Sequence, residues 1–111
     1  MIRVLVFIKK LNEISSEAFR RYYEDHHVPL VNRLLPFYAG YTRHYLTAPL
    51  YPQDAACDFD VVTELVFKDR SAFDAWSAAL ANPDVVDRIR ADERNFLQSS
   101  CTQMWAVESL N

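Results

Sequence analysis

The chain has 111 residues, of which 50% are hydrophobic and 14% aromatic, and its formal net charge is −3 at pH 7. This length fits one domain, residues 1–111, and the composition is far from that of a disordered chain. The single glycine excludes a glycine-rich phosphate loop. Residues 1–55 carry a net charge of +2 and residues 56–111 one of −5, without a basic stripe, so the sequence does not favour nucleic acid as a partner.

The N-terminal apolar run is too short to span a membrane, and no small-residue cleavage site follows it. We therefore expect a cytoplasmic protein without a membrane partner. The two cysteines, Cys57 and Cys101, are too few for a disulfide framework and are expected to be reduced thiols. No spacing of cysteine and histidine resembles a metal site.

A strand and an amphipathic helix are predicted first. Residues 2–9 are apolar on both alternating faces, which is typical of a central strand covered on both sides. Ser15 or Ser16 can cap a helix over residues 16–28, and Pro29 is expected to end it, because proline disfavours a helical conformation in the residue before it. The core-facing stripe of this helix is expected to contain Phe19, Tyr23 and Leu30.

The middle of the chain is predicted to be extended. Residues 38–47 are rich in Tyr and Thr and indicate a second strand. Residues 48–58 contain two prolines and no clear period, which predicts a long loop of the kind that forms lids or interface arms. Residues 59–68 alternate cleanly between apolar and mixed faces, so a third strand follows.

The C-terminal part is predicted to be a helical region followed by a fourth strand. Asn82 and Pro83 indicate an N-cap and a first-turn proline that begin a second helical segment. Residues 102–109 complete the strands. The buried positions of this region are expected to be Phe73, Trp76, Leu80, Val85, Ile89 and Phe96.

The predicted order is βαββαβ, which favours an α+β ferredoxin-like sandwich with its helices on one face of the sheet. Val62 and Val66 would then lie on the helix-free face and leave apolar surface uncovered. A second copy packed sheet to sheet would bury it. We therefore predict a homodimer in the form of a dimeric α+β barrel.

The chain resembles the EthD family of dimeric α+β-barrel proteins over nearly its whole length. The residues that carry this resemblance are the opening strand, the helix leading into His27-Val-Pro-Leu30, the strand of residues 62–67, and Asp92-Glu-Arg-Asn-Phe96. The resemblance implies a small dimer with neither metal nor organic cofactor. It also implies a link to oxidative degradation of ether-type compounds, or to dehydratases and decarboxylases of aromatic polyketides. A second histidine at 26 and valine at 28 depart from the commoner pattern.

Three residues are candidates for catalysis. His27 matches the family histidine, and an imidazole can take or give a proton at neutral pH; a helix-capping role is the alternative. Glu64 is expected in the dimer barrel, where burial would raise its pKa, unless it forms an ion pair with Arg3 or Arg43. Asp92 could orient a histidine, although the simplest topology does not predict that it contacts His27. The neighbouring Glu93 is interpreted as a solvated helix charge.

Aromatic side chains are abundant enough to line a pocket between helices and sheet, which would suit a small hydrophobic or aromatic ligand. Each could equally belong to the core, and His26 could be a surface residue. The candidate ligand-binding residues are Tyr22, Tyr23, His26, Trp76, Phe96 and Trp105.

The favoured function is a cofactor-independent enzyme of oxidoreductase or lyase type. It would use histidine acid/base chemistry on a small hydrophobic or aromatic carbonyl or hydroxyl compound. The alternative is a non-catalytic binding or accessory protein of an oxidative degradation pathway. A structural interaction module would be favoured if the chain's own side chains filled the pocket.

Overall fold

The computed structural model describes residues 1–110 and contains one four-stranded antiparallel sheet in the order β2-β3-β1-β4. Its strands are β1 (Ile2–Ile8), β2 (Gly40–Tyr45), β3 (Val61–Phe67) and β4 (Gln103–Val107). Each lies within its predicted range. The predicted ferredoxin-like order, with β1 between β3 and β4, is confirmed.

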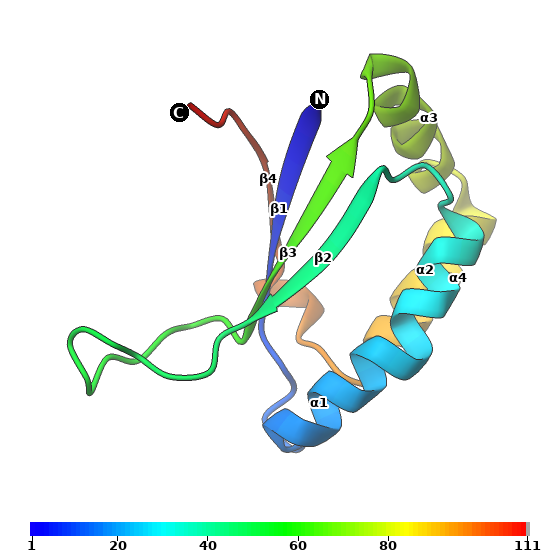
Figure 1. Cartoon of the computed structure of the whole chain (residues 1–111). Helices are drawn as coiled ribbons and strands as arrows, with labels where there is room; N and C mark the ends of the chain where they lie inside the picture. Colours follow the sequence, from blue (N-terminus) through cyan, green and yellow to red (C-terminus); the bar gives the residue numbers. More distant parts are fainter. Residues whose placement is uncertain (111) are drawn as a thin grey trace.

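The helices cover only one face of this sheet (Figure 1). The N-caps predicted at Ser15 and Asn82 are observed: Ser15 accepts a hydrogen bond from the Ala18 amide at the start of α1, and Asn82 accepts one from the Asp84 amide at the start of α4. Asp69 caps α3 in the same way. The helical segments are α1 (Ser16–Tyr22), η1 (Tyr23–His27), α2 (Val28–Leu34), α3 (Arg70–Leu80), α4 (Pro83–Glu93) and η2 (Ser99–Cys101).

The first helix does not end at Pro29, so that prediction was wrong. Proline lies instead in the first turn of α2, directly after η1, which is a π-helical segment. The amide of Val28 donates to the carbonyl of Tyr23, five residues earlier, and this wider turn leads directly into the proline. The helix therefore continues to Leu34, and His27 lies inside it.

The π segment also decides which side chains face the sheet. At about 100° per residue, positions four apart in an α-helix drift by about 40° each time, so such a stripe would rotate away from the core. A π turn advances less per residue and offsets part of this drift. The buried stripe consequently consists of Phe19, Tyr23, His27 and Val31, whereas the predicted Leu30 is only partly buried.

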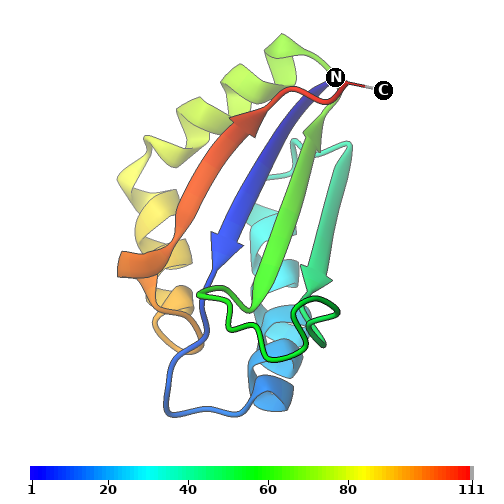
Figure 2. The ribbon, with the colours of Figure 1, turned by 90° about the vertical axis from the view of Figure 1, so that its left-hand side faces the viewer.

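Alternate residues of each strand lie on opposite faces of the sheet. On the helix-covered face lie Val4, Val6, Ile8, Val61, Thr63, Leu65 and Phe67, all buried. The helix-free face, which we call the open face, is turned toward the viewer in Figure 2. From the strand register the open face carries Arg3, Leu5, Phe7, Thr42, His44, Val62, Glu64, Val66, Gln103, Trp105 and Val107.

Candidate active site

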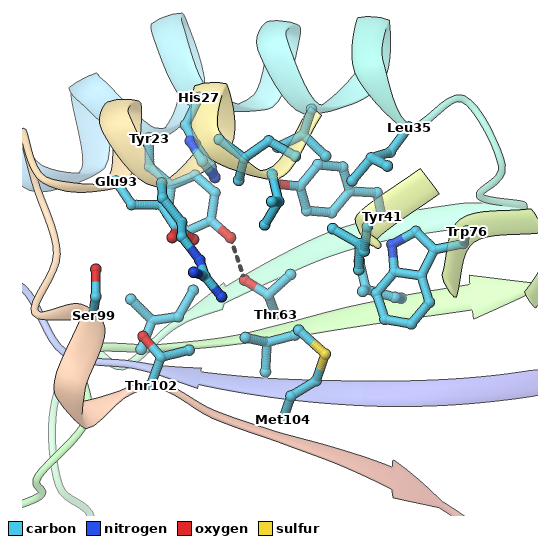
Figure 3. Close-up of a pocket in the computed structure, with 18 of the residues that line it drawn as sticks. Tyr23, His27, Leu35, Tyr41, Thr63, Trp76, Glu93, Ser99, Thr102 and Met104 are labelled. Carbon is cyan, nitrogen blue, oxygen red and sulfur yellow. Dashed lines mark hydrogen bonds between the residues drawn. The ribbon is translucent and has the colours of Figure 1, made fainter. Parts of the chain in front are cut away.

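A cavity of about 630 Å³ lies between the helix-covered face of the sheet and the helices. Its lining changes along its length (Figure 3). Leu35, Tyr41 and Trp76 lie at one end, and Trp76 donates a hydrogen bond from Nε1 to the hydroxyl of Tyr38. Glu93, Ser99 and Thr102 lie at the other end. The cavity is within the size range of small-molecule sites.

His27 forms part of the cavity wall and is 5% exposed. Phe96, which is fully buried, packs against the imidazole with a ring-centroid distance of 4.9 Å, and Tyr23 meets it edge-on at 5.5 Å. Apolar rings thus hold the imidazole in place. His27 was expected in the last turn of a helix that stops before Pro29, but it lies inside a continuous helix and lines the cavity.

Asp92 of α4 holds the other side of the His27 ring. Its Oδ2 lies 2.9 Å from His27 Nδ1, and its Oδ1 accepts a 2.6 Å hydrogen bond from the hydroxyl of Tyr22. Asn95 donates to the same hydroxyl at 2.9 Å. This contact between Asp92 and His27 was not predicted, because the simplest topology places the end of the first helix and the end of the second at opposite edges of the helical layer.

The hydrogen bond fixes the role of each imidazole nitrogen. A carboxylate can only accept, so Nδ1 carries the proton and Nε2 is left with its lone pair when the ring is neutral. Asp92 is the only hydrogen-bond partner of the ring within residues 1–110, so Nε2 has none. In that range every fully buried side-chain nitrogen or oxygen has a partner, which means that Nε2 is not fully buried. Nε2 is therefore accessible from the cavity.

Burial favours the uncharged form of this histidine. Desolvation lowers the pKa of His27 below its ordinary value, while the Asp92 carboxylate acts in the opposite direction and raises it. The net direction is downward, so the imidazole is neutral at pH 7. A neutral ring with an accessible Nε2 can accept a proton.

Glu93 also lines the cavity, although the sequence interpretation placed it in solvent. It lies next to Asp92 at the end of α4 and is only partly exposed. Burial raises the pKa of Glu93 to about 7, with Arg90 lowering it and Asp92 raising it further. At neutral pH this carboxyl group is consequently protonated in a large fraction of the molecules.

Two hydroxyl groups lie deeper in the cavity. The hydroxyl of Tyr23 is 2.7 Å from that of Thr63, which is 2% exposed, and burial raises the pKa of Tyr23. Tyr41 lies beside them, and burial raises its pKa as well. Both phenols are therefore neutral hydrogen-bonding groups at physiological pH.

Glu64 lies on the open face, opposite to His27. Its carboxylate is 2.5 Å from Arg3 Nη1 and 3.3 Å from His44 Nε2. Hydrogen bonds from His44 and Arg3 lower the pKa of Glu64, so the predicted rise is wrong for the single chain, and the alternative of an ion pair with Arg3 is the one observed. The geometry does not bring Glu64 to the cavity.

The predicted ligand-binding residues fall into three groups. Tyr23 and Trp76 line the cavity. Tyr22 and Phe96 lie behind its wall, where they contact Asp92 and His27. His26 is exposed and stacks on Tyr22 at 4.8 Å, and Trp105 is 59% exposed on the open face, because a strand places alternate residues on opposite sides.

Several cavity residues were not predicted, including Tyr41, Arg90 and Arg94. Arg90 could have been found, because it follows Ile89, which the sequence predicts to be buried.

Within residues 1–110 no group of three His, Cys, Asp or Glu side chains is placed to hold a metal ion. In that same part of the chain, no helix is both long and apolar enough to cross a membrane.

Comparison with known proteins identifies the family. Residues 11–100 match the model of the EthD domain, and the chain belongs to the EthD family. No curated protein sequence matches the chain.

Solved structures share the fold at low sequence identity. An ethyl tert-butyl ether D (EthD) family protein from Bacillus halodurans has a TM-score of 0.67 and 17% identity, over 99% of this chain and 100% of that one. An EthD-like protein from Ralstonia eutropha has a TM-score of 0.67 and 20% identity, over 94% and 88%. A dimeric protein of ferredoxin-like fold from Bacteroides fragilis has a TM-score of 0.61 and 7% identity, over 97% and 95%.

Proposed function

We propose that this EthD-family protein is a cofactor-independent enzyme that moves a proton on a small hydrophobic or aromatic compound bearing a carbonyl or hydroxyl group. The observation that carries the proposal is the orientation of His27. Asp92 holds Nδ1 at 2.9 Å, which leaves Nε2 as a proton acceptor on the wall of a largely apolar cavity.

The proposed step is general acid/base catalysis. His27 Nε2 accepts a proton from the carbon next to a substrate carbonyl, or from a phenol, and the electron pair of the broken bond remains on the substrate as an enolate or phenolate. The imidazolium that forms is stabilised by Asp92, and the buried position of the pair strengthens this interaction. Tyr22 and Asn95 keep the Asp92 carboxylate in position. Proton return from Nε2 restores the neutral ring.

Glu64 has no role in this proposal. Glu64 lies on the open face, so the sheet stands between it and the cavity. Its partners His44 and Arg3 favour the charged form of the carboxyl group. The residues proposed to act are His27 as acid/base and Asp92 as the group that positions it.

Hydrogen exchange tests the proposal without knowledge of the natural substrate. Proton NMR in D₂O at neutral pD would follow loss of the α-proton signals of a ketone that carries an aromatic ring, such as 2-tetralone. We expect exchange faster than in buffer, and His27→Gln should slow it by about 10²- to 10⁴-fold. His26→Gln is the matched control, since that exposed neighbour faces away from the cavity, and it should leave the rate nearly unchanged.

Two results would count against the enzyme. Equal rates for the two histidine variants would remove His27 from the chemistry. Binding of such ketones without any exchange above buffer would favour the alternative function, a non-catalytic small-molecule binding or accessory protein.

We also propose a homodimer formed through the open face. Apolar side chains of this face remain accessible in the single chain: Phe7 and Val62 are partly exposed and Trp105 is 59% exposed. The loop between β2 and β3 projects on the same side, with Leu50 and Tyr51 almost fully exposed (Figure 1). The B. fragilis structure of the same fold is described as dimeric, which supports this assembly.

A further inference from the structure

The polar end of the cavity carries two cations that the proposed proton transfer does not use. Arg90 and Arg94 lie on α4 and at its end, and both line the cavity together with Glu93. Their spacing of three and four residues puts the three side chains on one face of the helix. Across from them, the segment leading into β4 supplies the hydroxyl groups of Ser99, Ser100 and Thr102.

The two arginines at this end form no close ion pair within residues 1–110, although Arg90 acts on Glu93 at longer range and lowers its pKa. Four arginines have a carboxylate within 4.0 Å, namely Arg3, Arg21, Arg43 and Arg70. Of the arginines without such a partner among residues 1–110, Arg90 and Arg94 are the two that line the cavity. The negative end of the α4 dipole is a reason for basic residues in its last turn. It does not account for a cluster of hydroxyl groups lining the same end of the cavity.

We propose that this end of the cavity binds the carboxylate of an aromatic acid whose ring system fills the end lined by Leu35, Tyr41 and Trp76. Guanidinium groups match a carboxylate in charge and geometry, and hydroxyl groups can donate to its remaining lone pairs. The inference rests on the proposed function, because it names the class of substrate that would be presented to His27.

Glu93 makes this binding depend on pH. The ionisable groups around it are Arg90, Arg94, Asp92, His27 and Tyr23. An anionic ligand beside Glu93 favours the protonated carboxyl group, since two carboxylates repel and an acid can donate to a carboxylate. Affinity should therefore be highest below about pH 7 and fall as Glu93 ionises, whereas Glu93→Gln should remove most of this dependence.

A pair of probes of equal shape tests the charge preference. Isothermal titration calorimetry at pH 6 would compare 2-naphthoate with its neutral analogue 2-naphthamide. Charge-assisted hydrogen bonds predict that naphthoate binds about 10- to 100-fold more tightly. The double variant Arg90→Gln/Arg94→Gln should bind the two probes equally. Arg33→Gln, on the exposed surface of α2, should retain the preference.

Three results would overturn the proposal: equal affinity of the wild-type protein for both probes, no binding of either probe, or a preference that survives in the double variant. These outcomes are separate from the fate of His27. If hydrogen exchange did not depend on His27 while the arginine-dependent preference was observed, the proton-transfer function would fail and the carboxylate site would stand.

Discussion

The helix-covered face of the sheet favours the neutral forms of its ionisable groups, whereas the open face favours a charged form. On the covered face, burial shifts the pKa of His27 downward and that of Glu93 upward, so both neutral forms are favoured. On the open face, His44 and Arg3 lower the pKa of Glu64 and favour its charged form. Glu64 and the buried Thr63 are adjacent in β3, so the face, and not the position in the sequence, decides the chemistry.

We infer from this difference that the covered face serves chemistry and the open face serves assembly. The cavity is lined by residues of one chain and contains the groups that can exchange a proton near neutral pH. The open face combines apolar side chains with an ion pair between Arg3 and Glu64, which fits an interface with an apolar core and paired charges. If this view is correct, changes on one face should leave the other intact.

The largest effect is expected from Val62→Lys on the open face. A lysine there would have to be buried without a partner in the dimer, so light scattering should report the 12.9 kDa chain mass instead of twice that value. Ala78→Lys, on the exposed surface of α3, is the control and should remain dimeric.

The same variant sharpens the comparison between the faces. The Val62→Lys monomer should still bind 2-naphthoate within about threefold of the wild-type affinity, because Val62 contributes nothing to the cavity and energetic effects at separate sites are nearly independent. Loss of binding together with the dimer would show that the cavity needs the second copy.

A smaller effect is expected from Glu93→Gln on the covered face. The folded-state pKa of Glu93 is raised to about 7 from an ordinary value of 4.5, so the folded chain binds this proton more strongly than the unfolded chain. Its contribution to the free energy of unfolding is present below about pH 4.5 and is lost as pH rises through 7.

Urea unfolding at pH 5 and pH 8 would measure this loss. The wild type should lose on the order of 1 kcal/mol more than Glu93→Gln over this interval, after allowance for the partial exposure of the side chain. An identical pH dependence in both proteins would mean that Glu93 is solvated, as the sequence alone suggested.

The strands and caps were predictable because their signals are local. Alternation set the four strands, and Asn82 before Pro83 marked the start of α4. The continuation of the first helix through Pro29 was missed, since a π turn is a response to packing and has no sequence pattern of its own. The contact between His27 and Asp92 was missed for a different reason, since it joins residues 65 positions apart and depends on how the two helical segments lie side by side.

Placement of side chains within the site was less predictable. The spacing of four from Phe19 through Tyr23 and His27 to Val31 does indicate that His27, and not His26, faces the core, but only if the helix is known to continue. The burial of Glu93 depends on how α4 lies against the sheet, which is a tertiary property. Trp105 was misplaced because a pocket was expected only from aromatic content, without regard to which face of β4 it occupies.

The central claim, that Asp92 holds His27 as a neutral base with Nε2 open to the cavity, can be tested by ¹⁵N NMR of the imidazole rings across a pH titration. Signals of the three histidines can be assigned with His26→Gln, His27→Gln and His44→Gln. We predict that His27 is protonated on Nδ1 and titrates below its ordinary pKa of 6.5, and that Asp92→Asn lowers this pKa further because it removes the group that raises it. A His27 ring protonated on Nε2, or one that titrates above 6.5, would contradict the account.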